Sequence, residues 1–179
     1  MLEIIHNLDI NTLNLIRDNL SNPVMDKLMI FITSLGDKGF IWIAIGLILV
    51  AKKKYRKIGF MLLIALLITS LIGEGILKNI VQRARAFVTY PDISILITPP
   101  TSYSFPSGHT ASSFTAAVIL GYYFKKFRYI FYIFASLIAF SRLYLYVHYP
   151  SDIIAGILLG VTCGLITIKL INNKFMLEK

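Results

Sequence analysis

Residues 141–152, which read SRLYLYVHYPSD, bring together three side chains that could do chemistry: Arg142, His148 and Asp152. If Pro150 opens a helix, Asp152 lies in the first turn of that helix and His148 lies just before it. Their four-residue spacing would let the carboxylate accept a proton from one imidazole nitrogen and leave the other nitrogen free to attack. The plainer alternative is a histidine and an aspartate that cap a helix at a membrane surface.

Arg142 argues for a functional site rather than for a helix cap. About thirteen apolar residues separate it from the basic end of its run, which corresponds to about 20 Å of a hydrocarbon layer of about 30 Å. An arginine at that depth normally faces a protein interior or a polar cavity.

Two further segments could complete a site for a phosphoryl group. Three cations, Lys78, Arg85 and Arg142, could bind the oxygens of a phosphoryl group. The guanidinium groups of the two arginines could each bind two such oxygens in bidentate fashion. Residues 106–109, Pro-Ser-Gly-His, would begin a helix whose free N–H groups bind an anion, with the Ser107 hydroxyl as a further donor. Of the two histidines in these segments, His109 and His148, one could attack phosphorus and the other could protonate the departing oxygen.

Long apolar runs must position these residues. The chain has 179 residues, of which 56% are hydrophobic and 15% charged, which is typical of a polytopic membrane protein. We expect an all-α membrane helical bundle with about five to six transmembrane helices, preceded by an interfacial helix within residues 1–23. The single cysteine excludes an intrachain disulfide, and the N-terminus does not resemble a cleavable signal peptide.

The net charge of +9 does not indicate nucleic-acid binding, because the basic residues fall in short clusters between apolar runs, at residues 52–57, 125–128 and 169–179. This pattern is typical of cytoplasmic loops. Counting crossings from these clusters puts every candidate site residue on the opposite face. The sequence therefore predicts a multi-pass plasma-membrane protein with an extracytoplasmic site.

Three local features leave the packing open. Residues 36–39 (GDKG) break an apolar stretch, either as a kink in one span or as a boundary between two short helices. Residues 79–106 form a long connection, which is often functional. Gly156, Gly160 and Gly164 repeat every four residues, a spacing that permits close helix contact within the bundle or in a homodimer.

Taken together, three segments resemble the type 2 phosphatidic acid phosphatase superfamily. Its signature is Lys-x6-Arg-Pro, Pro-Ser-Gly-His and Ser-Arg-x5-His-x3-Asp. The second and third parts match in full at residues 106–109 and 141–152, and the first matches at Lys78 and Arg85 but has Ala86 where the family usually has proline. Proline there would stiffen the turn after the arginine.

The resemblance implies a single integral-membrane phosphatase domain over residues 1–179, with its catalytic core in residues 58–170. It implies that His148 is the nucleophile that forms a phosphohistidine, that Asp152 orients His148, and that His109 is the general acid. The implied phosphate-binding residues are Lys78, Arg85, Ser107, Gly108 and Arg142. The family needs neither a metal nor another cofactor. Arg83 lies outside the signature and is interpreted only as a possible head-group contact.

The implied substrate is a lipid phosphate, drawn from the membrane lipids. Small members with an outward site resemble undecaprenyl pyrophosphate phosphatases, and the alternatives are phosphatidylglycerophosphate and phosphatidic acid. Without the family, His109, His148 and Asp152 could form a two-histidine, one-carboxylate metal site, although the nearby cations would repel a divalent ion. A lipid transporter or flippase would also bury charges, but along a pathway through the membrane rather than at one face.

Overall fold

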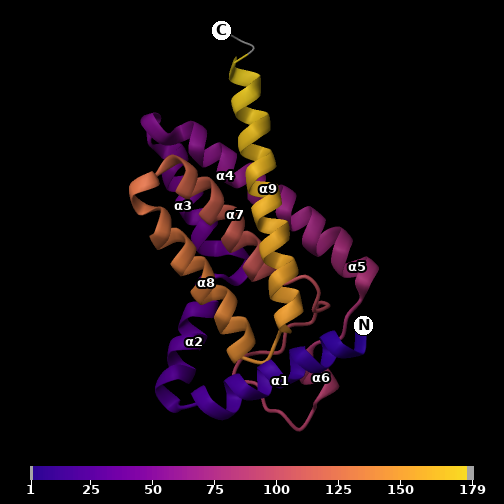
Figure 1. The fold of residues 1–179 in the computed structure, drawn as a ribbon. Coiled ribbons are helices and arrows are strands. Elements are labelled where there is room, and N and C mark those ends of the chain that lie inside the picture. Colours follow the sequence, from indigo (N-terminus) through magenta and orange to yellow (C-terminus); the bar gives the residue numbers. More distant parts are fainter. Residues whose placement is uncertain (1, 177–179) are drawn as a thin grey trace.

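The computed structural model describes residues 2–176 and folds that part of the chain into helices without strands. The main helices are α1 (Leu2–Leu20), α2 (Pro23–Leu35), α3 (Phe40–Ala51), α4 (Arg56–Ser70), α5 (Lys78–Val81), α6 (Ala86–Thr89), α7 (Gly108–Tyr123), α8 (Arg128–Tyr144) and α9 (Pro150–Met176). Helices α2 to α5 and α7 to α9 build an elongated bundle, and α1 lies across one end of it (Figure 1). The expected all-α class is confirmed.

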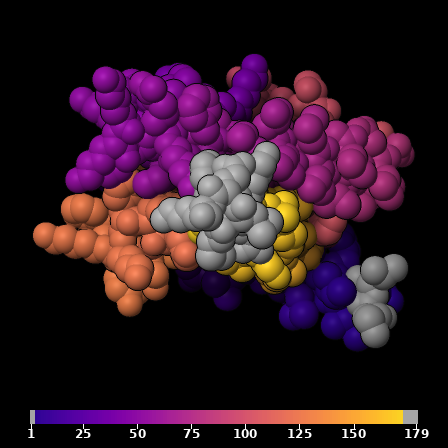
Figure 2. Space-filling view, turned by 90° about the horizontal axis from the view of Figure 1, so that it is seen from above, coloured from indigo at the N-terminus to yellow at the C-terminus, as the bar shows by residue number. Residues whose placement is uncertain are grey.

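Helix α7 forms the centre of the bundle. Between Thr110 and Gly121 every residue except Ser112 is buried. The helix packs against α4, α8 and α9, and a hydrogen bond from Trp42 Nε1 of α3 to Ser113 Oγ (2.9 Å) satisfies two polar groups inside this apolar core. Viewed along the bundle, α9 (yellow) lies near the middle, with the α3–α5 side (purple to magenta) along one side of it (Figure 2).

The glycine stripe of α9 is used inside the chain. A Cβ atom at Gly160 would lie 2.3 Å from the carbonyl oxygen of Ala111, and one at Gly156 would lie 2.8 Å from that of Ser107. Gly164 likewise faces Val118. Since all three contacts are made with α7 or its N-cap, Ser107, the stripe brings the start of α9 against the start of α7.

The break predicted at residues 36–39 separates two short helices. Asn22 caps α2 by accepting from the backbone N–H groups of Val24 and Met25. Past the end of α2, Lys38 and Gly39 take positive φ angles of 51° and 71°, and α3 continues at 43° to α2. The turn between the two helices carries Asp37, which is exposed and lies beside His109 of α7.

Helix length and composition alone identify two to three membrane crossings in the described residues. Two helical stretches, Lys53–Thr89 and Pro150–Asn172, are long and apolar enough to cross a membrane, and the bent pair α2 and α3 adds a third if it counts as one span. Helices α7 and α8 are shorter, at 16 and 17 residues. The count of five to six crossings is therefore not confirmed.

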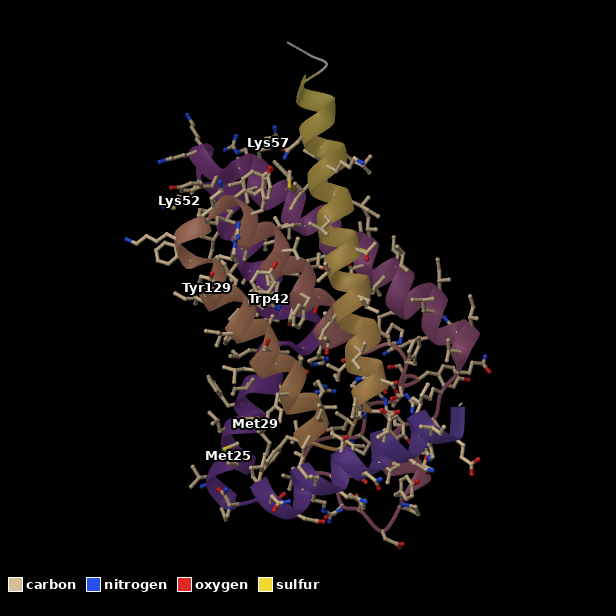
Figure 3. The ribbon with its side chains drawn as sticks, viewed as in Figure 1. Met25, Met29, Trp42, Lys52, Lys57 and Tyr129 are labelled. Carbon is tan, nitrogen blue, oxygen red and sulfur yellow. The ribbon has the colours of Figure 1, made fainter. Side chains whose placement is uncertain are left out.

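Short irregular segments interrupt or follow two of the apolar runs. Helix α4 is followed by a π-helical segment, Leu71–Leu77, which leads into α5. Helix α8 ends at Tyr144, and a turn over residues 145–149 precedes α9, which begins at Pro150 as predicted. Lys52 and Lys57 lie at the end of the bundle opposite α1 (Figure 3). Of the predicted basic cluster at residues 169–179, positions 177–179 lie outside the described residues.

Candidate active site

His148 and Asp152 meet at the junction of α8 and α9. The turn before Pro150 holds His148, and the first turn of α9 holds Asp152, so that His148 Nδ1 lies 3.4 Å from Asp152 Oδ2. Both residues are almost fully buried, at 1% and 0% exposure. Tyr146, in the same turn, has a positive φ of 60°, which tightens the reversal between the two helices.

Asp152 is held by several donors at once. Ser104 Oγ donates to Asp152 Oδ2 at 2.5 Å, and the backbone N–H of Tyr149 donates to the same oxygen at 2.9 Å. Arg83 donates to the other oxygen, Oδ1, at 2.7 Å. A buried carboxylate with this many donors is fixed in orientation and remains charged.

The neighbours of His148 assign its tautomer. Arg85 NH1 lies 3.1 Å from His148 Nε2, and because a guanidinium only donates, Nε2 must be the accepting nitrogen. The ring proton therefore sits on Nδ1, facing Asp152. Burial, followed by the charges of Arg85 and Arg142, holds the pKa of His148 well below its usual range, against the opposing effect of Asp152. His148 is thus a neutral imidazole with its lone pair on Nε2.

Lys78 is the first residue of α5, and Arg85 lies early in the connection that follows this helix. Arg85, at 4% exposure, donates to the carbonyl oxygens of Ser102 (2.7 Å), Tyr103 (3.2 Å) and Val147 (2.8 Å). Lys78 Nζ lies 2.8 Å from Glu74 Oε1 and donates to Ser102 Oγ at 2.9 Å. Both cations are therefore fixed by the irregular segment before α7.

Arg142 provides a hydrogen-bond donor without an acceptor. It is 2% exposed, and its NH1 group donates to Thr33 Oγ1 of α2. Its Nε is the one buried side-chain nitrogen or oxygen without a partner in the described range 2–176. A buried guanidinium nitrogen left unpaired is costly, and an oxyanion bound beside it would remove that cost.

The start of α7 lies on the other side of the same space. Ser107 is the N-cap of α7 and accepts hydrogen bonds from the backbone N–H (3.5 Å) and the hydroxyl group (2.9 Å) of Thr110. A Cβ atom at Gly108 would lie 2.3 Å from Glu74 Oε1, so the carboxylate of Glu74 sits directly against this helix start. His109 follows in the first turn, and its Nε2 lies 2.9 Å from Asp37 Oδ1.

These groups surround a cavity of about 1100 Å³. The predicted site residues that line it are Lys78, Arg85, Gly108, His109, Arg142 and His148. Ser107 and Asp152 do not line the cavity, but Asp152 contacts His148, which does. The rest of the wall is largely apolar and includes Leu63, Leu66 and Leu67 of α4.

Sequence reasoning missed four residues that the fold brings to the site: Asp37, Ser102, Ser104 and Asp9. Only Asp37 had a local signal, since it is the acidic residue of the predicted break at residues 36–39. Arg83, interpreted as a possible head-group contact, lies instead between Asp152 and Asp9, at 2.7 Å from each, and does not line the cavity.

The metal alternative finds no geometric support, because each histidine has a separate carboxylate. His109 pairs with Asp37, whereas His148 pairs with Asp152. Within residues 2–176, no three His, Cys, Asp or Glu side chains are grouped to hold a metal ion.

Comparison with known proteins gives a consistent result. The sequence profile of the PAP2 superfamily matches residues 54–176. Undecaprenyl-diphosphatase of Sulfolobus acidocaldarius is 35% identical over 147 residues, which cover 82% of this chain and 70% of that protein. Phosphatidylglycerophosphatase B of Bacillus subtilis is 31% identical over 151 residues, covering 78% and 71%.

A solved structure shares the fold. The crystal structure of Aquifex aeolicus LpxE superposes with a TM-score of 0.80 at 29% identity, covering 90% of this chain and 95% of that one. The profile match spans more than half of the chain, and both curated relatives align over most of their length. The chain therefore belongs to the PAP2 superfamily and is one of its phosphatases.

Proposed function

We propose that this protein removes the terminal phosphate from a membrane lipid diphosphate through a phosphohistidine at His148, without a metal ion. Undecaprenyl diphosphate, which would be converted to undecaprenyl phosphate, is the substrate we favour. The relative from Sulfolobus acidocaldarius, named an undecaprenyl-diphosphatase, supports this choice of lipid.

One observation carries the proposal: three buried cations and a neutral imidazole line a single cavity, and one of the cations has a nitrogen without a partner. Lys78, Arg85 and Arg142 are 4%, 4% and 2% exposed. Three cations buried so close together repel one another unless an anion lies between them. A phosphoryl group would neutralise them and would give Arg142 Nε its missing acceptor.

In the first step, the lone pair of His148 Nε2 attacks the terminal phosphorus. Binding of the phosphoryl group draws the Arg85 guanidinium to the substrate oxygens and frees Nε2 from its hydrogen bond. As the N–P bond forms, the bond from phosphorus to the bridging oxygen breaks, and His109 gives a proton to that oxygen. Asp152 accepts the Nδ1–H hydrogen bond and stabilises the positive charge that develops on the imidazole.

In the second step, water attacks the phosphorus of the phosphohistidine. His109, now neutral, takes a proton from the water, the N–P bond breaks, and inorganic phosphate leaves. His148 recovers its lone pair on Nε2. The cations stabilise the charged oxygens of phosphorus in both steps, so the proposed reaction needs no metal to do so.

The lining of the cavity suits a lipid that carries a charged head group. Its lining includes the three cations Lys78, Arg85 and Arg142 as well as the apolar side chains Ile30, Ile43, Leu63 and Leu67. Many apolar side chains on α2 to α4 are also exposed. An isoprenoid or acyl chain would lie along this apolar wall while the phosphate enters the polar end.

We further propose a topology with about five crossings, in which α2 and α3 form one broken span and α4–α5, α7, α8 and α9 each cross once. The basic residues Lys52 and Lys57 lie at the end of the bundle opposite α1 (Figure 3), which supports placing α1 and the site on the extracytoplasmic side. In this arrangement, residues 1–23 form the interfacial segment and residues 58–170 the catalytic core of a single domain.

Phosphatidylglycerophosphate is the second candidate substrate. The relative from Bacillus subtilis, named phosphatidylglycerophosphatase B, favours it. Its terminal phosphate would use the same cations, but its leaving group is a glycerol hydroxyl rather than a lipid phosphate. The two candidates therefore differ in how strongly they depend on the general acid.

Phosphate release tests the function directly. The purified protein in detergent, with EDTA present, is assayed on undecaprenyl diphosphate, phosphatidylglycerophosphate and phosphatidic acid, with His148→Ala as the matched control. We expect release that requires His148 and persists in EDTA, fastest with undecaprenyl diphosphate. Activity that disappears in EDTA and returns with one metal would contradict the mechanism, and uptake of lipid without phosphate release would indicate a transporter.

A further inference from the structure

Asp9 is a buried carboxylate on the helix that lies across the end of the bundle. It is 2% exposed, although α1 is otherwise polar or exposed along much of its length. Its Oδ1 accepts from the backbone N–H of Ser151 at 2.9 Å, and its Oδ2 accepts from the Ser151 hydroxyl at 2.5 Å. The contact ties α1 to the first turn of α9, one residue before Asp152. Asp9 also lies outside residues 54–176, to which the superfamily profile matches.

Arg83 links Asp9 to the candidate catalytic pair. Its NH2 group lies 2.7 Å from Asp9 Oδ2, and its NH1 group lies 2.7 Å from Asp152 Oδ1. The guanidinium also stacks on the ring of Tyr149, with Cζ 3.8 Å from the ring centroid. Both nitrogens at the end of the guanidinium are thus directed at carboxylates, and neither reaches the cavity.

The charges of Asp152, Arg83 and Asp9 suggest what the carboxylate of Asp9 contributes to the reaction. When His148 attacks phosphorus, its imidazole becomes positively charged, and the negative charge of Asp152 stabilises it. Arg83 alone would offset that negative charge, because it is a permanent cation in direct contact with Asp152. Asp9 compensates the charge of Arg83, so the three groups together carry one net negative charge. The same contacts fix Asp152 Oδ1, which leaves Oδ2 directed at His148.

We propose that Asp9 is a positioning residue of the reaction. Through Arg83, it sets the charge and the orientation of Asp152, and thereby supports His148 as the nucleophile. The catalytic pair is then complete only when α1 is seated on the bundle. This inference rests on the proposed function, because it assigns Asp9 a part in the attack by His148.

The test compares Asp9→Asn, Arg83→Gln and the double variant Asp9→Asn/Arg83→Gln. Asparagine has nearly the shape of aspartate and retains an acceptor for Ser151, but it removes the charge. We expect Asp9→Asn to lower kcat by about tenfold with KM changed less than about twofold, since Asp9 does not contact the substrate. Because Asp9 acts through Arg83, the double variant should lose no more activity than the worse of the two single variants.

The matched control is Asp18→Asn, which removes an exposed carboxylate from the same helix and should keep the wild-type kcat and KM. Size-exclusion chromatography and thermal unfolding in detergent give the folded fraction to which kcat is normalised. Asp9→Glu is a second variant that retains the charge. It should keep a higher kcat per folded molecule than Asp9→Asn even if its unfolding temperature is lower.

Wild-type kcat in folded Asp9→Asn would overturn the inference and leave Asp9 as an anchor for α1. Losses in Asp9→Asn and Arg83→Gln that multiply in the double variant would also overturn it, because the two residues would then act separately. His148→Ala, measured in parallel, separates this result from the proposed function. An active His148→Ala refutes the nucleophile itself, whereas an inactive His148→Ala beside a fully active Asp9→Asn refutes only the role of Asp9.

Discussion

His109 Nε2 lies 2.9 Å from Asp37 Oδ1, although 72 residues separate them in the chain. An adjacent carboxylate attracts the positive charge of a protonated imidazole. Asp37 is therefore placed to help His109 in its proposed role as the general acid. Both residues line the cavity, so the candidate site contains two pairs of a histidine and a carboxylate.

Replacing Asp37 should reveal its role through the leaving group. We predict that Asp37→Asn lowers kcat on a lipid phosphate ester by about tenfold to a hundredfold, because the alkoxide must be protonated as it leaves. The loss on p-nitrophenyl phosphate, whose leaving group needs little protonation, should be below about threefold. Steady-state kinetics with both substrates measures the ratio. Asp92→Asn, an exposed change outside the cavity, is the control, and equal losses on both substrates would refute the assignment.

Glu74 lies where the substrate phosphate is expected. Its carboxylate is 2.8 Å from Lys78 Nζ and lies against Gly108 at the start of α7. Because it competes for the same cation and repels an incoming anion, we predict that Glu74→Gln lowers the inhibition constant of inorganic phosphate and the KM of the substrate by about threefold to tenfold. Competition assays measure both values. Weaker binding of phosphate in the variant would mean that Glu74 instead holds Lys78 in place.

The pH profile should report the environment of His148, which lies in the turn between α8 and α9. Burial, followed by the charges of Arg85 and Arg142, lowers the pKa of His148 well below 6.5, so this proposed nucleophile stays unprotonated as the pH falls to that value. We predict that kcat/KM, which reflects groups of the free enzyme, loses half of its value only below pH 6.5 on the acid side. A profile of kcat/KM from about pH 4.5 to pH 8 tests this, and a half-loss at or above pH 6.5 would contradict it.

Close packing of α9 on α7 should make Gly160 sensitive to any side chain. A Cβ atom there would lie 2.3 Å from the carbonyl oxygen of Ala111. This oxygen belongs to the backbone of the central helix α7, so it cannot move away as the end of a flexible side chain could. We predict that Gly160→Ala destabilises the protein by about 1–3 kcal/mol and lowers its unfolding temperature. Gly75→Ala is the control, since a Cβ atom at Gly75 meets nothing within 4 Å. Equal unfolding temperatures for the two variants would show that the two helices separate easily.

Much of the fold and of the candidate site could be predicted because the relevant signals are local. Pro150 marks the start of α9, and the short spacing from His148 to Asp152 places the two side chains in reach once that helix begins. The apolar runs correspond to helices, and the glycine spacing predicts the close face of α9. The count of crossings was not confirmed, because the long runs are divided into shorter or bent helices.

Only the tertiary structure decided which distant residues join these local patterns. Asp9 reaches Ser151 and Arg83 because α1 lies across the starts of α9 and the connection after α5. Asp37 reaches His109 because the left-handed turn at Lys38 and Gly39 directs it toward α7.

The sequence by itself determined the reactive side chains and the local turns that present them, since helix starts, glycine spacing and hydrophobic runs act over a few residues. The packing of α1 and α2 decided which carboxylates support the two histidines. Such pairings depend on the free energy of burying whole helices against one another. No short stretch of the chain encodes that free energy.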